Sequence, residues 1–139
     1  MMTQTRPTEL HHRRILMTRR PAAAAEARGQ VRAIICAWEL PVDPDIAVLL
    51  TSDLVTHAIV NWDSETITLA VRCSRDQLRV DVYDTSLPLP MAVDEPVVRR
   101  ARPGLALVAS LSAECGSFLT FTGQAMYFAL AFQADWFQL

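Results

Sequence analysis

Hydrophobic residues recur along the chain with two periods, one typical of helices and one typical of strands. The alanine run Ala22–Ala25 favours helix, and apolar residues follow it at helical spacing. These are Val31, Ile34, Ile35 and Trp38. The pattern predicts a first helix that ends near Glu39. A second helix is predicted from Asp43-Pro44 to about Asn61, because aspartate caps helices well and proline suits the first helical turn.

Alternation of apolar and polar positions, the mark of a half-buried strand, occurs at Ile67–Cys73 and Leu78–Val82. Three further strands are expected at His11–Thr18, Phe118–Phe121 and Met126–Phe132. The polar residues Ser74–Asp76 separate Ile67–Cys73 from Leu78–Val82, so these two are expected to pair as a hairpin.

The segment 85–102 contains three prolines and little periodicity, and its length is typical of a functional or mobile connection. A third helix is predicted to begin at Pro103-Gly104. The order of elements predicts an α+β two-layer sandwich, in which helices cover one face of a mixed, mostly antiparallel sheet. We expect one domain over residues 12–133, with a flexible N-terminal tail at 1–11 and an apolar C-terminal tail at 134–139.

Composition excludes several classes of function. Half of the 139 residues are apolar (51%), which provides enough hydrophobic surface for a core. The net charge of -2 gives no general attraction to nucleic acid or to an anionic membrane, so neither is expected as a partner. The chain has no lysine. A P-loop and a protein-kinase-type site both need one, and both are therefore excluded.

The three cysteines, Cys36, Cys73 and Cys115, lie far apart in the sequence and in apolar runs. An odd number gives no closed set of disulfides, and we expect all three to be buried thiols. The N-terminal arginines are not followed by an apolar signal core, and no apolar run is long enough to span a bilayer. These features predict a cytoplasmic protein.

Asp53 and His57 are the first candidate functional residues. On a helical projection they lie in the middle of an apolar sector formed by Ile46, Leu49, Leu50 and Val60. Burying an unpaired ionisable group is costly, so the two side chains either satisfy each other, four residues apart, or line a polar pocket. Both interpretations remain open from this helix alone.

Asp84 and Gly104 are the next candidates. Asp84 has the parity of Leu78, Val80 and Val82, which places its carboxylate on the core side at the end of a strand; the alternative is a solvated aspartate that begins a turn. Gly104 lies where a loop meets a helix, and the backbone N–H groups of a helix N-terminus can hold a phosphate.

Four segments, in this order, resemble the motifs of the GHKL superfamily of ATPases, and most closely those of the small actinobacterial anti-sigma-factor serine kinases. The sequence Ser-Asp-Leu-Val-Thr-His-Ala at residues 52–58 is similar to the Ser-Glu-Leu-Val-Thr-Asn-Ala of that family. The other three segments are Leu78–Asp84, Arg102–Val108 and Gly123–Phe128. The resemblance covers about residues 12–133 and implies the Bergerat ATP-binding fold.

The resemblance also implies roles for individual residues. Asp84 would accept a hydrogen bond from the adenine amino group, the position of Asp53 would activate a nucleophile, and the position of His57 would bind magnesium. Ser86, Arg102, Gly104 and Leu105 would complete the ATP-binding set. Residues 86–102 would form a lid over the phosphates. A sigma factor or an anti-anti-sigma-type protein would be the partner, and a homodimer is the implied assembly.

The sequence departs from the family pattern at each of these segments. Asp53 stands in place of glutamate and is one methylene shorter. His57 stands in place of asparagine, although magnesium prefers oxygen ligands and imidazole suits softer metals. Residues 84–88 contain no glycine, and Arg102 replaces the first glycine of its motif. The sequence therefore predicts that adenine recognition through Asp84 survives, whereas the handling of magnesium and phosphate is degenerate.

Three functions are compared on this basis. The first is a regulatory protein of the anti-sigma type that acts through a protein partner, and the second is an active ATP-dependent serine kinase of the same family. The third is a hydrolase that uses His57 as a base or as a metal ligand. The chain has no Gly-x-Ser-x-Gly sequence, and its other histidines, His11 and His12, lie near the N-terminus, which ranks the hydrolase last.

Overall fold

The part of the chain that the structure describes folds into an α+β arrangement of five strands and three helices. The computed structural model describes residues 9–84, 106–120 and 123–133. Its elements, in chain order, are β1 (His11–Thr18), α1 (Ala22–Trp38), α2 (Pro44–Asn61), β2 (Thr66–Cys73), β3 (Gln77–Tyr83), α3 (Ala106–Leu111), β4 (Glu114–Leu119) and β5 (Gln124–Ala131).

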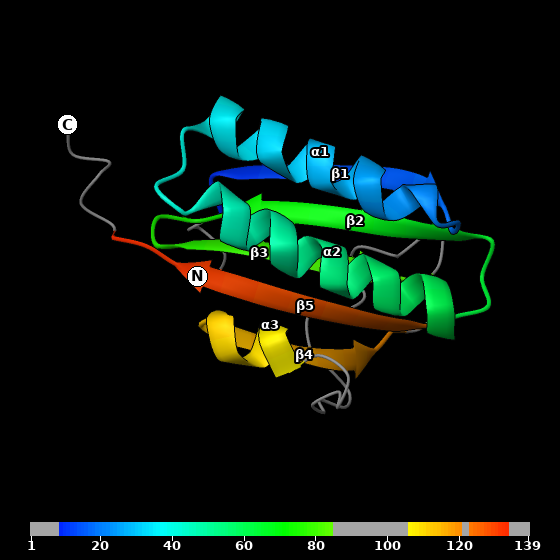
Figure 1. Cartoon of the computed structure of the whole chain (residues 1–139). Helices are drawn as coiled ribbons and strands as arrows, with labels where there is room; N and C mark the ends of the chain where they lie inside the picture. Colours follow the sequence, from blue (N-terminus) through cyan, green and yellow to red (C-terminus); the bar gives the residue numbers. More distant parts are fainter. Residues whose placement is uncertain (1–8, 85–105, 121–122, 134–139) are drawn as a thin grey trace, which may run out of the picture.

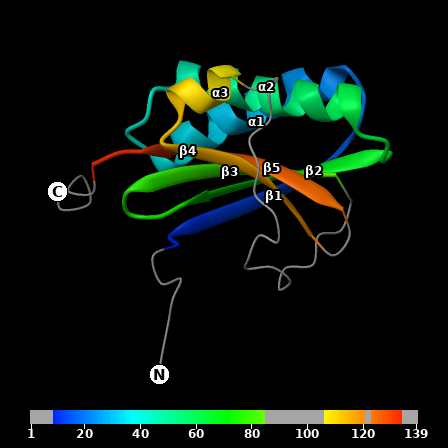
Figure 2. The ribbon, with the colours of Figure 1, turned by 90° about the horizontal axis from the view of Figure 1, so that it is seen from below.

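The strands form one sheet in the order β1-β2-β3-β5-β4. All three helices lie on the same face of this sheet, and the two layers are seen edge-on in Figure 2. The predicted α+β two-layer architecture is therefore confirmed. The prediction of a mixed sheet is wrong for the part of the chain that the structure describes, because all four pairings there are antiparallel.

Most elements lie where the sequence pattern predicts them, and the exceptions are at the edges of the sheet. Strand β4 begins at Glu114, four residues before the predicted start at Phe118. Its first half shows no apolar alternation, because Cys115 is the one apolar residue beside Glu114, Gly116 and Ser117. Strand β1 has the predicted bounds, but its first residue, His11, lies inside the predicted N-terminal tail, and the adjacent Leu10 N–H donates to the Cys73 carbonyl at 2.8 Å.

Local sequence explains the limits of the two long helices. Asp43 caps α2, since its carboxylate accepts a hydrogen bond from the Asp45 N–H at 2.9 Å, and Pro44 occupies the first helical position. Helix α1 ends at Glu39, whose φ of 55° is left-handed. Leu40 then donates back to the Ile35 carbonyl at 3.1 Å, which ends the helix with a reversed turn.

The core lies between the helices and the sheet. Alternate residues of the strands face the helices, among them Leu69, Val80 and Phe128, and each is fully buried. Leu50 and Leu54 of α2 pack into the same cluster. This cluster fixes α2 across the middle of the sheet, and α2 carries two of the candidate residues.

Several predictions concern residues outside the described ranges: Ser86, Arg102, Gly104, Leu105, the lid at 86–102 and the tail at 134–139. Among the cysteines, Cys73 is buried and Cys115 is half-buried. The prediction for Cys36 is wrong, because this residue is on the exposed side of α1. Among the described residues, no helix combines the length and the apolar character needed to cross a membrane.

Candidate functional site

Helix α2 presents a different face to the core from the one that its apolar periodicity predicted. The buried residues are Ala47, Val48, Leu50, Thr51, Leu54, Val55 and Ala58. Leu49 and Val60, which belong to the predicted apolar sector, are 43% and 72% exposed. The helix is apolar nearly all round, so periodicity alone does not identify its buried face. The prediction that Asp53 and His57 lie inside a buried stripe is therefore wrong.

Asp53 and His57 lie on the boundary between the buried face of α2 and solvent. Both are half-buried. Within the described residues, the Asp53 carboxylate has no hydrogen-bond or ion-pair partner, whereas the His57 ring nitrogen Nδ1 lies 3.4 Å from Asn61 Nδ2. Partial exposure removes most of the burial cost that the sequence interpretation relied on. It also leaves the Asp53 carboxylate accessible to a ligand.

Asp84 follows β3 directly and is held by the start of β5. Its N–H donates to the Gln124 carbonyl at 3.0 Å. In return, Asp84 Oδ1 accepts from the Gln124 N–H at 3.2 Å, and Oδ2 accepts from Gln124 Nε2 at 3.4 Å. Val80 and Val82 of the same parity face the core, as predicted. The Asp84 carboxylate thus joins the two central strands, and both of its oxygens already accept hydrogen bonds.

The sheet and α2 bring the candidate residues to one end of the molecule. Helix α2 and strand β5 run in opposite directions, so the C-terminal half of α2, which includes His57, lies at the same end as Gln124 and Asp84 (Figure 1). Among the described residues, no three histidine, cysteine, aspartate or glutamate side chains come together in a way that could hold a metal ion.

A second polar site lies on the other side of the sheet, which none of the described helices covers. We call this side the open face. Because paired residues of an antiparallel sheet point to the same side, the register places the residues of the open face in rows across the strands. The middle row is Arg14, Ala70, Asp81, Tyr127 and Gly116, and the next row is His12, Arg72, Arg79, Ala129 and Glu114.

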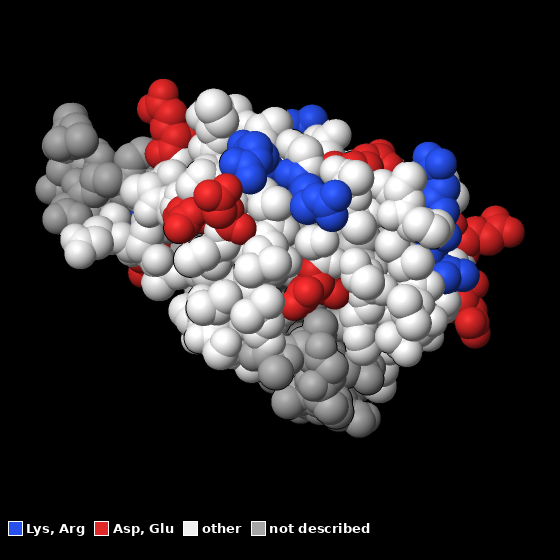
Figure 3. Space-filling model, viewed as in Figure 1, with Lys and Arg blue, Asp and Glu red and all other residues white. Residues whose placement is uncertain are grey.

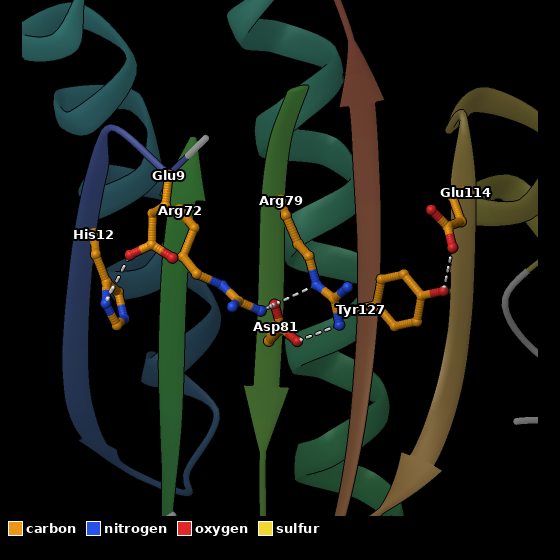
Figure 4. A network of polar contacts seen from close by, with 7 residues as sticks. All are labelled: Glu9, His12, Arg72, Arg79, Asp81, Glu114 and Tyr127. Carbon is orange, nitrogen blue, oxygen red and sulfur yellow. Dashed lines mark hydrogen bonds and ion pairs between the residues drawn. The ribbon is translucent and has the colours of Figure 1, made fainter. Parts of the chain in front are cut away.

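Asp81 is the centre of the polar network on the open face (Figure 4). Its carboxylate is fully buried and accepts two hydrogen bonds from Arg79, from Nε to Oδ1 and from Nη2 to Oδ2, both at 2.9 Å. Arg72 Nη2 approaches Oδ1 at 3.4 Å. Burial lowers the pKa of the Arg79 guanidinium, but the Asp81 carboxylate more than offsets this effect and raises that pKa above its usual value.

Tyr127 continues the network toward the edge of the sheet. The Arg79 guanidinium lies 3.9 Å from the centroid of the Tyr127 ring, a cation–π contact, and the Tyr127 hydroxyl donates to Glu114 Oε2 at 3.0 Å. Gly116 makes room for this ring, because a Cβ there would lie 3.2 Å from Tyr127 Cε1. Arg79 is consequently fixed on two sides, by a carboxylate and by an aromatic ring.

Sequence reasoning missed this network. The signal was the alternation of β3, where Arg79 and Asp81 stand two apart on the side opposite to the core residues. Charges of opposite sign at such a spacing share one face of a strand and can pair. On the helix-covered side, acidic and basic side chains lie in small patches (Figure 3).

Tyr83, on the open face, is expected to make the free energy of unfolding depend on pH in the alkaline range. Burial raises the pKa of Tyr83 to about 12. The usual tyrosine pKa is about 10, so between these values the unfolded chain loses a proton that the native protein keeps. The free energy of unfolding is therefore expected to fall as pH rises from about 10 to about 12. Urea unfolding at several alkaline pH values should show a smaller fall for Tyr83→Phe, and an equal fall in both proteins would contradict this origin.

Comparison of the chain with known proteins did not identify a relative. No protein-family model matches the sequence, and no curated protein matches it significantly. The resemblance to the GHKL motifs therefore stands on the residues of this chain alone.

Proposed function

We propose that this chain is a cytoplasmic regulatory protein of the anti-sigma type, with a GHKL-like fold and a degenerate nucleotide site, that acts by binding a protein partner. The partner would be a sigma factor or an anti-anti-sigma-type protein. The two-layer fold is compatible with this proposal. The order of the four similar segments along the chain supports it.

The contact between Asp84 and Gln124 carries the proposal of a degenerate site. In an intact site of this kind, the aspartate carboxylate would be reserved for the adenine amino group. Here both oxygens of Asp84 accept hydrogen bonds from Gln124, at 3.2 and 3.4 Å. A carboxylate has about four acceptor positions, so an incoming adenine amino group would share Asp84 with Gln124, and we expect this sharing to weaken adenine binding.

The second candidate function is an active serine kinase. The half-buried Asp53 carboxylate favours it, because this group has no hydrogen-bond or ion-pair partner among the described residues. A carboxylate with free acceptors could accept a proton from a serine hydroxyl. The shorter side chain of aspartate and the imidazole at position 57 weigh against this candidate.

Thermal melting with and without ATP and magnesium distinguishes the two functions. A ligand at a hundred times its dissociation constant stabilises a protein by about 2.7 kcal/mol, which is a shift of several degrees for a domain of this size. We expect a shift below about 1 °C at millimolar ATP. A shift of several degrees that requires magnesium and disappears in Asp84→Asn would contradict the degenerate site and favour the kinase. The melting temperature of Asp84→Asn without ligand controls for loss of folding.

The partner is tested separately. Immobilised protein should bind one of the sigma factors or anti-anti-sigma-type proteins encoded in the same genome, and each can be produced and measured by biolayer interferometry. If no such protein binds, the proposed class of partner is wrong.

The degenerate nucleotide site can be tested with the double variant Asp53→Glu/His57→Asn, which restores the residue types of the family. In thermal melting, this variant should gain an ATP-dependent stabilisation that the natural sequence lacks.

A further inference from the structure

On the open face, the guanidinium groups of Arg72 and Arg79 contact the Asp81 carboxylate, and Arg14 lies in the row of Asp81, two strands away. Arg14 and Asp81 belong to the middle row, and Arg72 and Arg79 to the next one. Asp81 is completely buried, so it neutralises one positive charge but is not accessible to an external ligand. The side chains of Arg72 and Arg79 are 28% and 29% exposed, and Arg14 is exposed. The strands β1, β2 and β3 therefore present an excess of accessible positive charge.

The guanidinium groups of the three arginines differ in the number of hydrogen bonds and contacts that they make. Arg79 makes both short hydrogen bonds to Asp81 and stacks on Tyr127, so its orientation is fixed. Arg72 has only the 3.4 Å contact to Asp81. Arg14 has no hydrogen-bond or ion-pair partner among the described residues. A guanidinium has five N–H donors, and most of those of Arg14 and Arg72 are available to an incoming anion.

The positive charges of Arg14 and Arg72 also influence the ionisation of the neighbouring His12. Arg14 and Arg72 both lower the pKa of His12, which is two residues before Arg14 on the same strand face. Burial is the larger cause of that lowering, and Glu9, whose Oε2 lies 3.5 Å from His12 Nδ1, opposes it. The register places Arg14 and Arg72 in adjacent rows of the neighbouring strands β1 and β2, so their positive charges form one region.

The residues around Arg14 and Arg72 indicate which kind of anionic ligand this surface can bind. Glu9 lies between His12 and Arg72, and Glu114 lies on the edge strand β4 at the far side of the network (Figure 4). These carboxylates would repel a long polyanion such as nucleic acid, whereas a short acidic segment fits between them. In the row below the arginines, Leu16 is 57% exposed, whereas Thr68, Ala125 and Phe118 are buried. A segment with acidic residues beside an apolar one would match Arg14, Arg72 and Leu16.

We propose that Arg14 and Arg72, on the open face of the sheet, bind neighbouring carboxylates of a short acidic segment of the protein partner. This inference rests on the proposed function as a partner-binding regulator and names the surface involved. A second copy of this chain fits less well, because two open faces in contact would bring guanidinium groups of the central strands toward one another.

The test measures binding of a fluorescently labelled hexaglutamate peptide to the full chain by fluorescence anisotropy at low salt. The double variant Arg14→Gln/Arg72→Gln keeps Arg79 and Asp81 paired and should fold. We expect it to bind the peptide at least about tenfold more weakly than the natural sequence does, since it loses two cations that can donate charge-assisted hydrogen bonds to carboxylates. Arg28→Gln is the matched control, because Arg28 lies on α1 and contacts Ser52 Oγ at 3.0 Å. Its affinity should stay within about twofold of the natural sequence.

Three outcomes would overturn the proposal. The first is no binding of the hexaglutamate peptide, or equal binding by the double variant. The second is equal or tighter binding of a thymidine hexanucleotide, which would make the face a nucleic-acid site. The third is a homodimer in sedimentation velocity that the double variant alone disrupts, which would assign the face to a second copy.

The partner protein separates this inference from the proposed function. If a partner binds the natural sequence and the double variant equally, the placement on the open face is wrong and the proposed function stands. If no sigma factor or anti-anti-sigma-type protein binds at all, the proposed class of function fails, whatever the peptide does.

Discussion

Arg79→Ala is expected to reduce the free energy of unfolding by about 3–5 kcal/mol, because it leaves the buried Asp81 carboxylate without its bidentate partner. Asp81 is fully buried, and the remaining contact with Arg72 is long, at 3.4 Å. Domains of this size have a total stability of about 5–15 kcal/mol, so the variant loses a large share of it. Urea unfolding followed by circular dichroism measures the loss.

The reason for the loss can be tested with a second substitution. In Arg79→Met/Asp81→Leu the buried carboxylate is removed together with its partner, and most of the lost stability should return. Arg28→Ala, at an exposed position of α1, removes a guanidinium without leaving a buried charge and should change stability by less than about 0.5 kcal/mol. A double variant as unstable as Arg79→Ala would show that the loss comes from the packing of Arg79 on Tyr127 rather than from the unpaired charge.

The second large effect is expected on α2, where two leucines five residues apart have opposite environments. Leu54 is fully buried, and its replacement by alanine should cost about 2–5 kcal/mol. Leu49 is 43% exposed, and the same replacement there should cost less than about 1 kcal/mol. Because both substitutions put alanine in the same helix, helix propensity cancels in the comparison. Thermal or urea unfolding of the two variants side by side gives the difference.

The result decides which face of α2 belongs to the core. If Leu49→Ala is the more destabilising variant, the sequence-based face would be correct, and Asp53 and His57 would be buried. If Leu54→Ala is the more destabilising one, the two ionisable residues lie at the solvent boundary. In that case a ligand can approach them without unfolding the core.

A nucleotide site and a partner surface on opposite sides of the sheet would serve separate roles. Asp53, His57 and Asp84 are associated with the helix side, whereas Arg14 and Arg72 are on the open face. Under the proposed function, loss of nucleotide chemistry at the first site would leave the second intact. A protein could in this way keep its ability to bind a partner after its nucleotide site has degenerated.

The sequence alone determined the elements and their layers. Strand alternation identified β2 and β3, and helix signals such as Asp43-Pro44 identified the start of α2, because these patterns depend on neighbouring residues in the chain. Strand alternation also predicted that the side chains of Val80 and Val82 face the core. It failed at β4, where an edge strand with Gly116 has no pattern to recognise.

Only the tertiary structure decided which side chains act together. Helix α2 is apolar on most of its surface, so its buried face depends on how it packs against β3 and β5 and not on its own periodicity. The pairing of Asp84 with Gln124 joins residues forty apart, and the row from Arg14 through Asp81 to Tyr127 requires the register of four strands. Such contacts are set by the packing of the whole sheet, to which every strand contributes. A local sequence pattern therefore suggests the residues involved but does not assemble the site.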